Sequence, residues 1–227
     1  MTSNVPAWLT PVAWVVVALT LASAAVIAFD VHVRRHRHAT VASEVVWITS
    51  ALYLGPVAVV LYRRHGRTGS TRSATDGSEA PTVVAGLPGG SASAIAHLIG
   101  VPLVLASGLT IAGIDLWVMI IVIGVVAIVL LAVHERTAVA GTRAARPTLG
   151  AAVGTAVVTV LAFDVGMVGW MLLLHYGSFM PPATDGVFWF LMQLGVLVGL
   201  LTGYPVVRRL AGRRADGPVR TPRSRTA

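Results

Sequence analysis

Cysteine and lysine are both absent from this chain. The lack of cysteine excludes disulfide bonds, thiolate metal sites and a cysteine nucleophile. Charge is also scarce: 11% of the residues are charged, whereas a soluble domain usually has about 25%. Hydrophobic residues make up 56% of the sequence. Such a composition cannot cover a globular surface with polar groups, so it predicts a protein whose outer surface faces lipid.

The alternation of polar and apolar residues that is typical of a membrane β-barrel is missing as well. Open strands cannot span lipid because their backbone groups would stay unpaired. Long apolar runs are present instead, and about 20 apolar residues are enough to cross the hydrocarbon core as a helix. We therefore predict an all-α fold, a polytopic transmembrane helical bundle of about six spans. The runs cover residues 8–29, 41–62, 94–112, 116–133, 149–174 and 186–207.

The polar segments between the runs divide the chain into four parts. Residues 1–62 hold the first two spans with a short outer connection, and residues 94–207 hold the other four. Residues 63–93 are rich in Gly, Ser, Thr and Pro and bury little apolar surface, which predicts a flexible cytoplasmic loop. The arginine-rich residues 208–227 are predicted to form a disordered cytoplasmic tail.

The basic charge consists of 17 arginines. Six spans put both termini on one side of the membrane, together with the connections 63–93 and 134–148. That side then holds 14 arginines, and three, Arg34, Arg35 and Arg37, lie on the other. Because arginine accumulates in cytoplasmic loops, we expect both termini in the cytoplasm. If the connection after the first run were cytoplasmic too, one of the first two runs would have to be re-entrant.

The net charge of +8 does not indicate a nucleic-acid-binding protein. The arginines sit just outside the apolar runs, where membrane topology explains them. The partners that we expect are the lipid bilayer, anionic lipid headgroups at the basic tail, and a second copy of the chain or another membrane protein.

Asp164 lies in the middle of the fifth run, where an acidic side chain costs roughly 2.5–3.5 kcal/mol on insertion and normally faces protein or water. Met167, Met171 and His175 follow it on the same stripe of a helix. A carboxylate, two thioethers and an imidazole could hold or pass a soft cation such as copper. The alternative is that the methionines fill the core and His175 is interfacial.

Other polar side chains fall within the runs. His97 begins the third run and Gln193 lies in the sixth, where it could hydrogen-bond to Asp164. We include His97 and Gln193 with the Asp164 stripe as candidates for an ion pathway. Glu44 lies near the outer end of the second run, and we expect it to be solvated at the interface.

A second group of possible ligands follows the first run. His32 and His36 have the spacing that lets two imidazoles share a metal on a helix, and Asp30 lies beside them. The interleaved arginines repel a cation, so the alternative is a solvated, pH-sensitive connection.

The sixth run contains a doubled G-x-x-x-G pattern, which lets helix backbones approach closely in lipid. This pattern predicts packing within the molecule or, alternatively, a homodimer face. The glycines concerned are Gly195, Gly199 and Gly203, with Gly166 on the fifth run.

Nucleotide loops, G-x-S-x-G, H-E-x-x-H and paired carboxylates are all missing, so we expect a non-enzymatic protein without a cofactor. Haem is disfavoured because His97, His134 and His175 lie near the ends of their spans.

Several stretches resemble an uncharacterised family of bacterial multi-pass inner-membrane proteins that is labelled only as a domain of unknown function. The stretches are FDVGMVGWM at 163–171, FWFLMQLG at 188–195, TGYPV at 202–206 and VWITSALYLGP at 46–56. The resemblance implies a place in the bacterial inner membrane but no activity. Members of that family often carry His-Cys-Gly-x-Gly-Cys at the start of the third span. Here His97 stands without either cysteine, so a thiolate-based function would be lost.

Two functions are compatible with these features. The first is a small transporter-like protein for a cation, a metal or protons that uses Asp164 in the fifth span. The alternative is a membrane scaffold or accessory subunit that packs through the glycine face of the sixth span.

Overall fold

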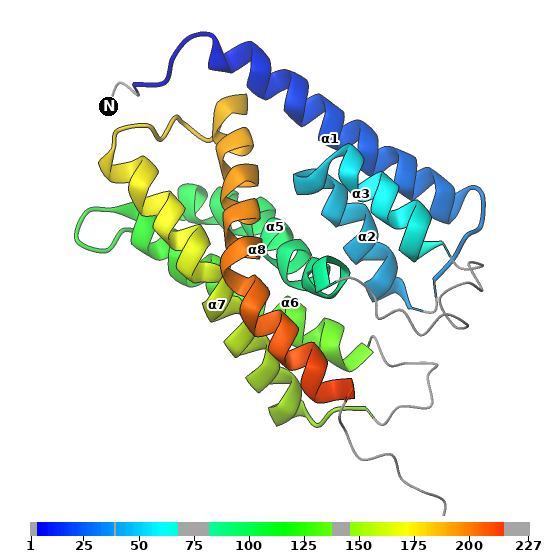
Figure 1. Cartoon of the computed structure of the whole chain (residues 1–227). Coiled ribbons are helices and arrows are strands. Elements are labelled where there is room, and N and C mark those ends of the chain that lie inside the picture. Colours follow the sequence, from blue (N-terminus) through cyan, green and yellow to red (C-terminus); the bar gives the residue numbers. More distant parts are fainter. Residues whose placement is uncertain (1–3, 39, 68–81, 138–145, 216–227) are drawn as a thin grey trace, which may run out of the picture.

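The computed structural model describes residues 4–38, 40–67, 82–137 and 146–215. Over these residues the fold is all-α, as predicted, and Figure 1 shows the helices as one bundle. The elements are α1 (Leu9–His32), α2 (Val41–Leu54), α3 (Pro56–Leu61), the π-helical turn η1 (Tyr62–Gly66), α5 (Thr82–Ser107), α6 (Asp115–Thr137), α7 (Leu149–Tyr176) and α8 (Gly186–Ala215). Among the described residues, five helices are long and apolar enough to cross a membrane: α1, α5, α6, α7 and α8.

The second apolar run, predicted as one span over 41–62, is a broken helix. α2 ends at Leu54 and α3 begins at Pro56, and Gly55 between them has a φ of 56°. That backbone angle favours glycine, and a proline fits the first turn of a helix but disrupts its interior. α2 has 14 residues. At 1.5 Å per residue it is about 21 Å long, which is shorter than the hydrocarbon core of roughly 30 Å.

α2 and α3 form a hairpin that returns to the end of α1 from which it started. Tyr62, directly after α3, donates a hydrogen bond of 3.0 Å to Asp30 Oδ2 near the end of α1. Arg67 Nε lies 3.3 Å from the same carboxylate oxygen. Gly55, at the tip of the hairpin, lies against Thr20 halfway along α1. The hairpin therefore enters the bundle to about its middle and leaves on the same side, which is the re-entrant alternative.

This hairpin changes the predicted arrangement of the chain ends. α8 runs beside α1 in the same direction, because Gly186 lies against Trp14 and Gln193 donates a hydrogen bond to Thr20. The described N-terminal segment and the end of α8 consequently lie at opposite ends of the bundle (Figure 1). The prediction that six spans bring both termini to one side is therefore not confirmed by the described residues, because run length alone did not show the break at Gly55.

Two boundaries also differ from the prediction. α5 begins at Thr82, so residues 82–93 of the predicted loop 63–93 are helical. Its glycines allow close packing: Gly90 lies against the ring of Tyr53, and Gly86 against Leu200. α8 continues to Ala215, past the predicted end at 207. The rest of the predicted loop and tail, residues 68–81 and 216–227, lies outside the described residues.

The apolar side chains form two clusters. The larger one lies mainly between α5, α6, α7 and α8, and the smaller one joins α1 to the hairpin. The smaller cluster contains Trp47, Ala51, Ala58 and Tyr62 of the hairpin and Ile27 of α1. Buried side chains thus hold the hairpin against α1.

The glycine face of α8 is covered by α7. A methyl group at Gly199 would stand 2.5 Å from the ring of Phe163, and one at Gly195 would stand 2.6 Å from Met167 Sδ. This packing lies within the molecule and leaves the face no room for a second copy. The glycines in this contact are Gly166 on α7 and Gly195, Gly199 and Gly203 on α8.

Candidate functional site

Two long-range hydrogen bonds join α2 of the hairpin to α5. Tyr53 Oη donates to the Leu87 carbonyl at 3.3 Å, and Ser91 Oγ donates to the Val46 carbonyl at 3.0 Å. The bond from Tyr53 holds the last turn of α2, at the hairpin tip, in the interior of the bundle. The chain then breaks at Gly55 and turns back, whereas a continuous helix would have carried the following residues farther along the bundle.

A pocket of about 210 Å³ lies beside this turn, and we call it the central pocket. Its walls come from α1, α2, α5 and α8, and most of the side chains are apolar. The polar and aromatic residues that line it are Thr20, Tyr53, His97, Trp189 and Gln193. The structure thus brings together two of the residues predicted for an ion pathway, His97 and Gln193.

His97 is buried, with 3% of its surface exposed. Its Nδ1 lies 2.8 Å from the carbonyl oxygen of Ser93. A carbonyl only accepts hydrogen bonds, so Nδ1 carries the proton and Nε2 presents a lone pair. Within the described part of the chain, Nε2 is buried and has no hydrogen-bond partner. An unpaired buried acceptor of this kind costs about 1–3 kcal/mol.

Gln193 adds a second acceptor to the same pocket. Its Nε2 donates to Thr20 Oγ1 at 3.2 Å, and Thr20 Oγ1 in turn donates to the Val17 carbonyl at 2.9 Å. The remaining amide oxygen, Gln193 Oε1, is buried without a partner among the described residues. The pocket therefore holds two unpaired acceptors, and a ligand there has to donate hydrogen bonds.

Asp164 lies away from the central pocket. It is half-buried on α7 and faces α6 at Gly124, where a Cβ would stand 3.5 Å from its Oδ2. The pairing of Asp164 with Gln193 that the sequence suggested is not formed, because the amide of Gln193 reaches Thr20 on α1 instead.

The other members of the Asp164 stripe do not share a pocket with it. Met167 and Met171 are buried in the larger apolar cluster, where they pack as core side chains. His175, near the end of α7, contacts the ring of Tyr176, with 5.2 Å between the ring centroids.

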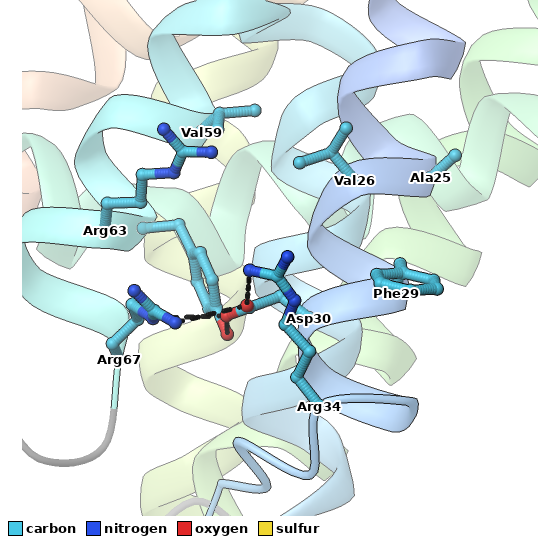
Figure 2. Close-up of a pocket in the computed structure, with 9 residues that line it drawn as sticks. Ala25, Val26, Phe29, Asp30, Arg34, Val59, Arg63 and Arg67 are labelled. Atoms are coloured by element: carbon cyan, nitrogen blue, oxygen red, sulfur yellow. Dashed lines mark hydrogen bonds and ion pairs between the residues drawn. The ribbon is translucent and has the colours of Figure 1, made fainter.

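A polar cluster surrounds Asp30 at the end of α1, as Figure 2 shows. Besides Tyr62 and Arg67, its carboxylate has Arg34 Nη1 at 3.7 Å and His36 Nδ1 at 3.5 Å. Burial and the bond to Asp30 raise the pKa of Tyr62 to about 12, so its hydroxyl stays a donor at neutral pH. Three positive or potentially positive groups thus surround one carboxylate.

This cluster does not form the metal site that the sequence suggested. His32 Nδ1 donates to the Ala28 carbonyl of its own helix at 3.1 Å, and only His36 approaches Asp30. The described residues contain no group of three His, Asp or Glu side chains that could hold a metal ion. The guanidinium of Arg67 occupies the position beside Asp30 where a cation would bind.

The buried carboxylate of Glu44 forms a second ion pair nearby. Only 3% of its surface is exposed, and its Oε1 lies 2.9 Å from Arg37 Nε and accepts a 3.1 Å hydrogen bond from the His38 backbone N–H. The expected solvation of Glu44 was wrong, because the connection after α1 folds back over the start of α2. Burial lowers the pKa of His38, and the Glu44 carboxylate offsets part of this effect.

An open groove of about 630 Å³ lies next to the Asp30 cluster, between α1 and α3, and we call it the interfacial groove. Its polar side is formed by Asp30, Arg34, Arg63 and Arg67 (Figure 2). Its apolar side is formed by Ala25, Val26, Phe29 and Val59. The sequence did not predict this groove, since it depends on the return of the hairpin to α1.

Comparison with known proteins covers the part of the chain from α5 to α8. A family model described as "Domain of unknown function (DUF4396)" matches residues 80–215. The matched part contains His97, Asp164 and Gln193, whereas α1, the hairpin and the interfacial groove precede it. No curated protein and no solved structure matches the chain. The match spans more than half of the sequence and bears out the resemblance to a family labelled as a domain of unknown function, so the chain belongs to this family.

Proposed function

We propose that the protein lies in the bacterial inner membrane with its arginine-rich end in the cytoplasm and its N-terminal end outside. The support is the distribution of charge over the folded chain. With α2 and α3 as a hairpin, the described arginines gather at one end of the bundle, which is the pattern of cytoplasmic loops. Those whose side chains are described are Arg34, Arg35, Arg37, Arg63, Arg64, Arg67, Arg136, Arg146, Arg208 and Arg209. Arg34, Arg35 and Arg37, which disagreed with a six-span arrangement, agree with this one.

We further propose that the central pocket binds a small cation that donates hydrogen bonds, such as ammonium, as part of a transporter-like function. The observation that carries this proposal is the pair of buried acceptors without partners, His97 Nε2 and Gln193 Oε1, in one pocket. Their lone pairs suit N–H donors of a cation. A pocket of about 210 Å³ is smaller than the 300–1,000 Å³ typical for drug-sized ligands, so the ligand is small.

Two further features favour a positive ligand. Leu52 and Tyr53, in the last turn of α2, line the pocket, and the C-terminal end of a helix carries partial negative charge. Interrupted helices that end near the bilayer midplane bind cations in this way in many transporters. The rings of Tyr53 and Trp189 also line the pocket, and aromatic faces attract cations.

The proposal moves the binding role from Asp164 to His97 and Gln193. Asp164 contacts Gly124 on another face of the bundle, so we assign it no part in holding the ligand. The alternative role as a scaffold receives no specific support, because α7 covers the glycine face through which a partner was expected to pack.

Uptake of radiolabelled methylammonium into liposomes that contain the purified protein tests this proposal. We expect His97→Gln and Gln193→Leu each to lower uptake at low methylammonium concentration about tenfold or more, because each loses a hydrogen bond to the charged ligand that contributes about 1.5–3 kcal/mol to its binding. Asp164→Asn should leave uptake close to that of the unaltered protein.

Equal uptake by the unaltered protein and by a His97→Gln, Gln193→Leu double variant would contradict the proposal. Loss of uptake in Asp164→Asn alone would restore the hypothesis that Asp164 carries the ion. Matching thermal unfolding curves for all the variants would show that the differences do not come from misfolding.

A further inference from the structure

The interfacial groove carries more positive than negative charge. Three guanidinium groups, those of Arg34, Arg63 and Arg67, line it against the single carboxylate of Asp30. Asp30 is already held by Arg67 at 3.3 Å and by Tyr62 at 3.0 Å. The excess of cationic groups makes the groove suitable for an anion.

Arg63 is the most available of these cations. It forms no hydrogen bond or ion pair with any described residue, and its side chain is exposed on η1. Figure 2 shows its guanidinium beside Val59 at the groove, apart from the dashed contacts that join Arg34 and Arg67 to Asp30. As far as the described residues go, its donors remain available to a ligand.

The apolar side of the groove continues into surface that faces lipid. Val26 and Phe29 on α1 are exposed apolar side chains, and they lie within four residues of Asp30, where the span ends. Val59 of α3 forms the opposite wall. A molecule in the groove therefore meets guanidinium groups at the membrane surface and hydrocarbon just inside it.

We propose that the interfacial groove binds one anionic phospholipid, with the lipid phosphate held by Arg63 together with Arg34 and Arg67. One acyl chain lies along Val26, Phe29 and Val59. Arginine binds phosphate through planar, paired donors, which suits this role better than a compact ammonium group would. The lipid would bridge α1 and α3 and so hold the hairpin against the bundle. This inference concerns a different site from the central pocket and does not depend on the proposed cation function.

The test measures lipid retention by the purified full chain in mild detergent, by native mass spectrometry. Phosphatidylglycerol is compared with phosphatidylcholine of the same acyl chains, and glycerol phosphate serves as a soluble headgroup. We expect phosphatidylglycerol to be retained at least fivefold more strongly than phosphatidylcholine. A basic residue near a membrane surface contributes a factor of about five, so Arg63→Gln should weaken phosphatidylglycerol binding about fivefold.

Arg64→Gln is the matched control, because Arg64 neighbours Arg63 on η1 and is exposed but does not line the groove. It should change binding less than twofold. Val59→Trp fills the apolar side without altering charge and should also weaken retention of phosphatidylglycerol.

Three outcomes would overturn the inference. Equal losses in Arg63→Gln and Arg64→Gln would mean a diffuse charge effect without a site. Equal retention of the two lipids would exclude selectivity for an anionic headgroup. Displacement of the lipid by an equal concentration of glycerol phosphate, with Val59→Trp unchanged, would mean a phosphate site that does not use the acyl chain.

Discussion

Tyr62 donates a 3.0 Å hydrogen bond to Asp30, and this bond joins the returning end of the hairpin to the end of α1. The two residues lie 32 positions apart in the sequence. Their contact is what places the connection after α1 and the segment after α3 on the same side of the bundle. The end of the bundle at which each of these segments lies thus depends on a buried polar pair.

Removing the hydroxyl in Tyr62→Phe should destabilise the protein by about 1.5–3 kcal/mol, because the bond is made to a charged carboxylate. Thermal unfolding in detergent measures this loss. The folded-state pKa of Tyr62 is raised to about 12 from its ordinary 10.0, so its contribution is complete below pH 10 and is lost as the pH rises toward 12. Tyr176→Phe, at an exposed tyrosine, should change neither the midpoint nor its pH dependence.

The absence of cysteine makes the chain suitable for mapping with single introduced thiols. We expect Arg35→Cys and Arg64→Cys to react with a membrane-impermeant maleimide from the same side, the cytoplasm. Asn4→Cys and Ser178→Cys should react from the opposite side, since Asn4 N–H bonds the Ser178 carbonyl at 2.9 Å. Labelling of positions 35 and 64 from opposite sides would contradict the re-entrant hairpin and favour six spans.

Gly199→Ala should destabilise the contact between α7 and α8 by about 1–3 kcal/mol, as an overpacked core does. The added methyl group would stand 2.5 Å from the Phe163 ring, which cannot move without disturbing the larger cluster. Gly154→Ala on α7 is the control, because a Cβ there meets nothing within 4 Å. Alanine favours helices over glycine, so the control should be neutral or slightly stabilising. Equal unfolding temperatures for both variants would show that α7 does not cover the glycine face.

Acidification should weaken the fold through His38. Burial lowers its pKa below the ordinary 6.5, and its Nε2 has no partner among the described residues. The unfolded chain therefore binds a proton at His38 more readily than the folded chain does. The contribution of His38 to the free energy of unfolding is present above pH 6.5 and is lost as the pH falls through the folded-state pKa. Unfolding measured between pH 5 and 8 should become less dependent on pH in His38→Gln. His65→Gln, at an exposed histidine of η1, should keep the original dependence.

Run length and composition were enough to predict the helical class and the position of α7, which begins at Leu149 as expected and ends two residues beyond the predicted end. They were not enough to predict the hairpin, although Gly55 and Pro56 are adjacent in the sequence. Apolar character is the same on both sides of that break. A count of hydrophobic residues therefore treats two short helices as one span.

The candidate site was predicted in part. His97 and Gln193 stood out as polar residues within apolar runs, but their meeting in one pocket depends on how α5 and α8 pack, which helical periodicity does not determine. Thr20 was missed because a threonine can bond its own helix and carries no charge, so it is not unusual in a span. Asp164, Met167 and Met171 do lie on one stripe of α7. Asp164 faces α6 at Gly124, however, whereas Met167 packs against Gly195 of α8 and both methionines lie in the larger cluster.

In the proposed membrane arrangement, the break at Gly55 determines whether the described part of the chain crosses the bilayer an odd or an even number of times. The four family-matched helices α5 to α8 start and finish at the same end of the bundle. α1 adds one crossing from end to end, whereas the hairpin returns to the end from which it started and adds none. A substitution that let α2 and α3 fuse into one continuous span would make the number of crossings even. Either the N-terminal end or the entire matched domain would then have to face the other compartment. In that arrangement, one residue with a φ of 56° separates a chain whose described ends lie in different compartments from one whose described ends lie in the same compartment.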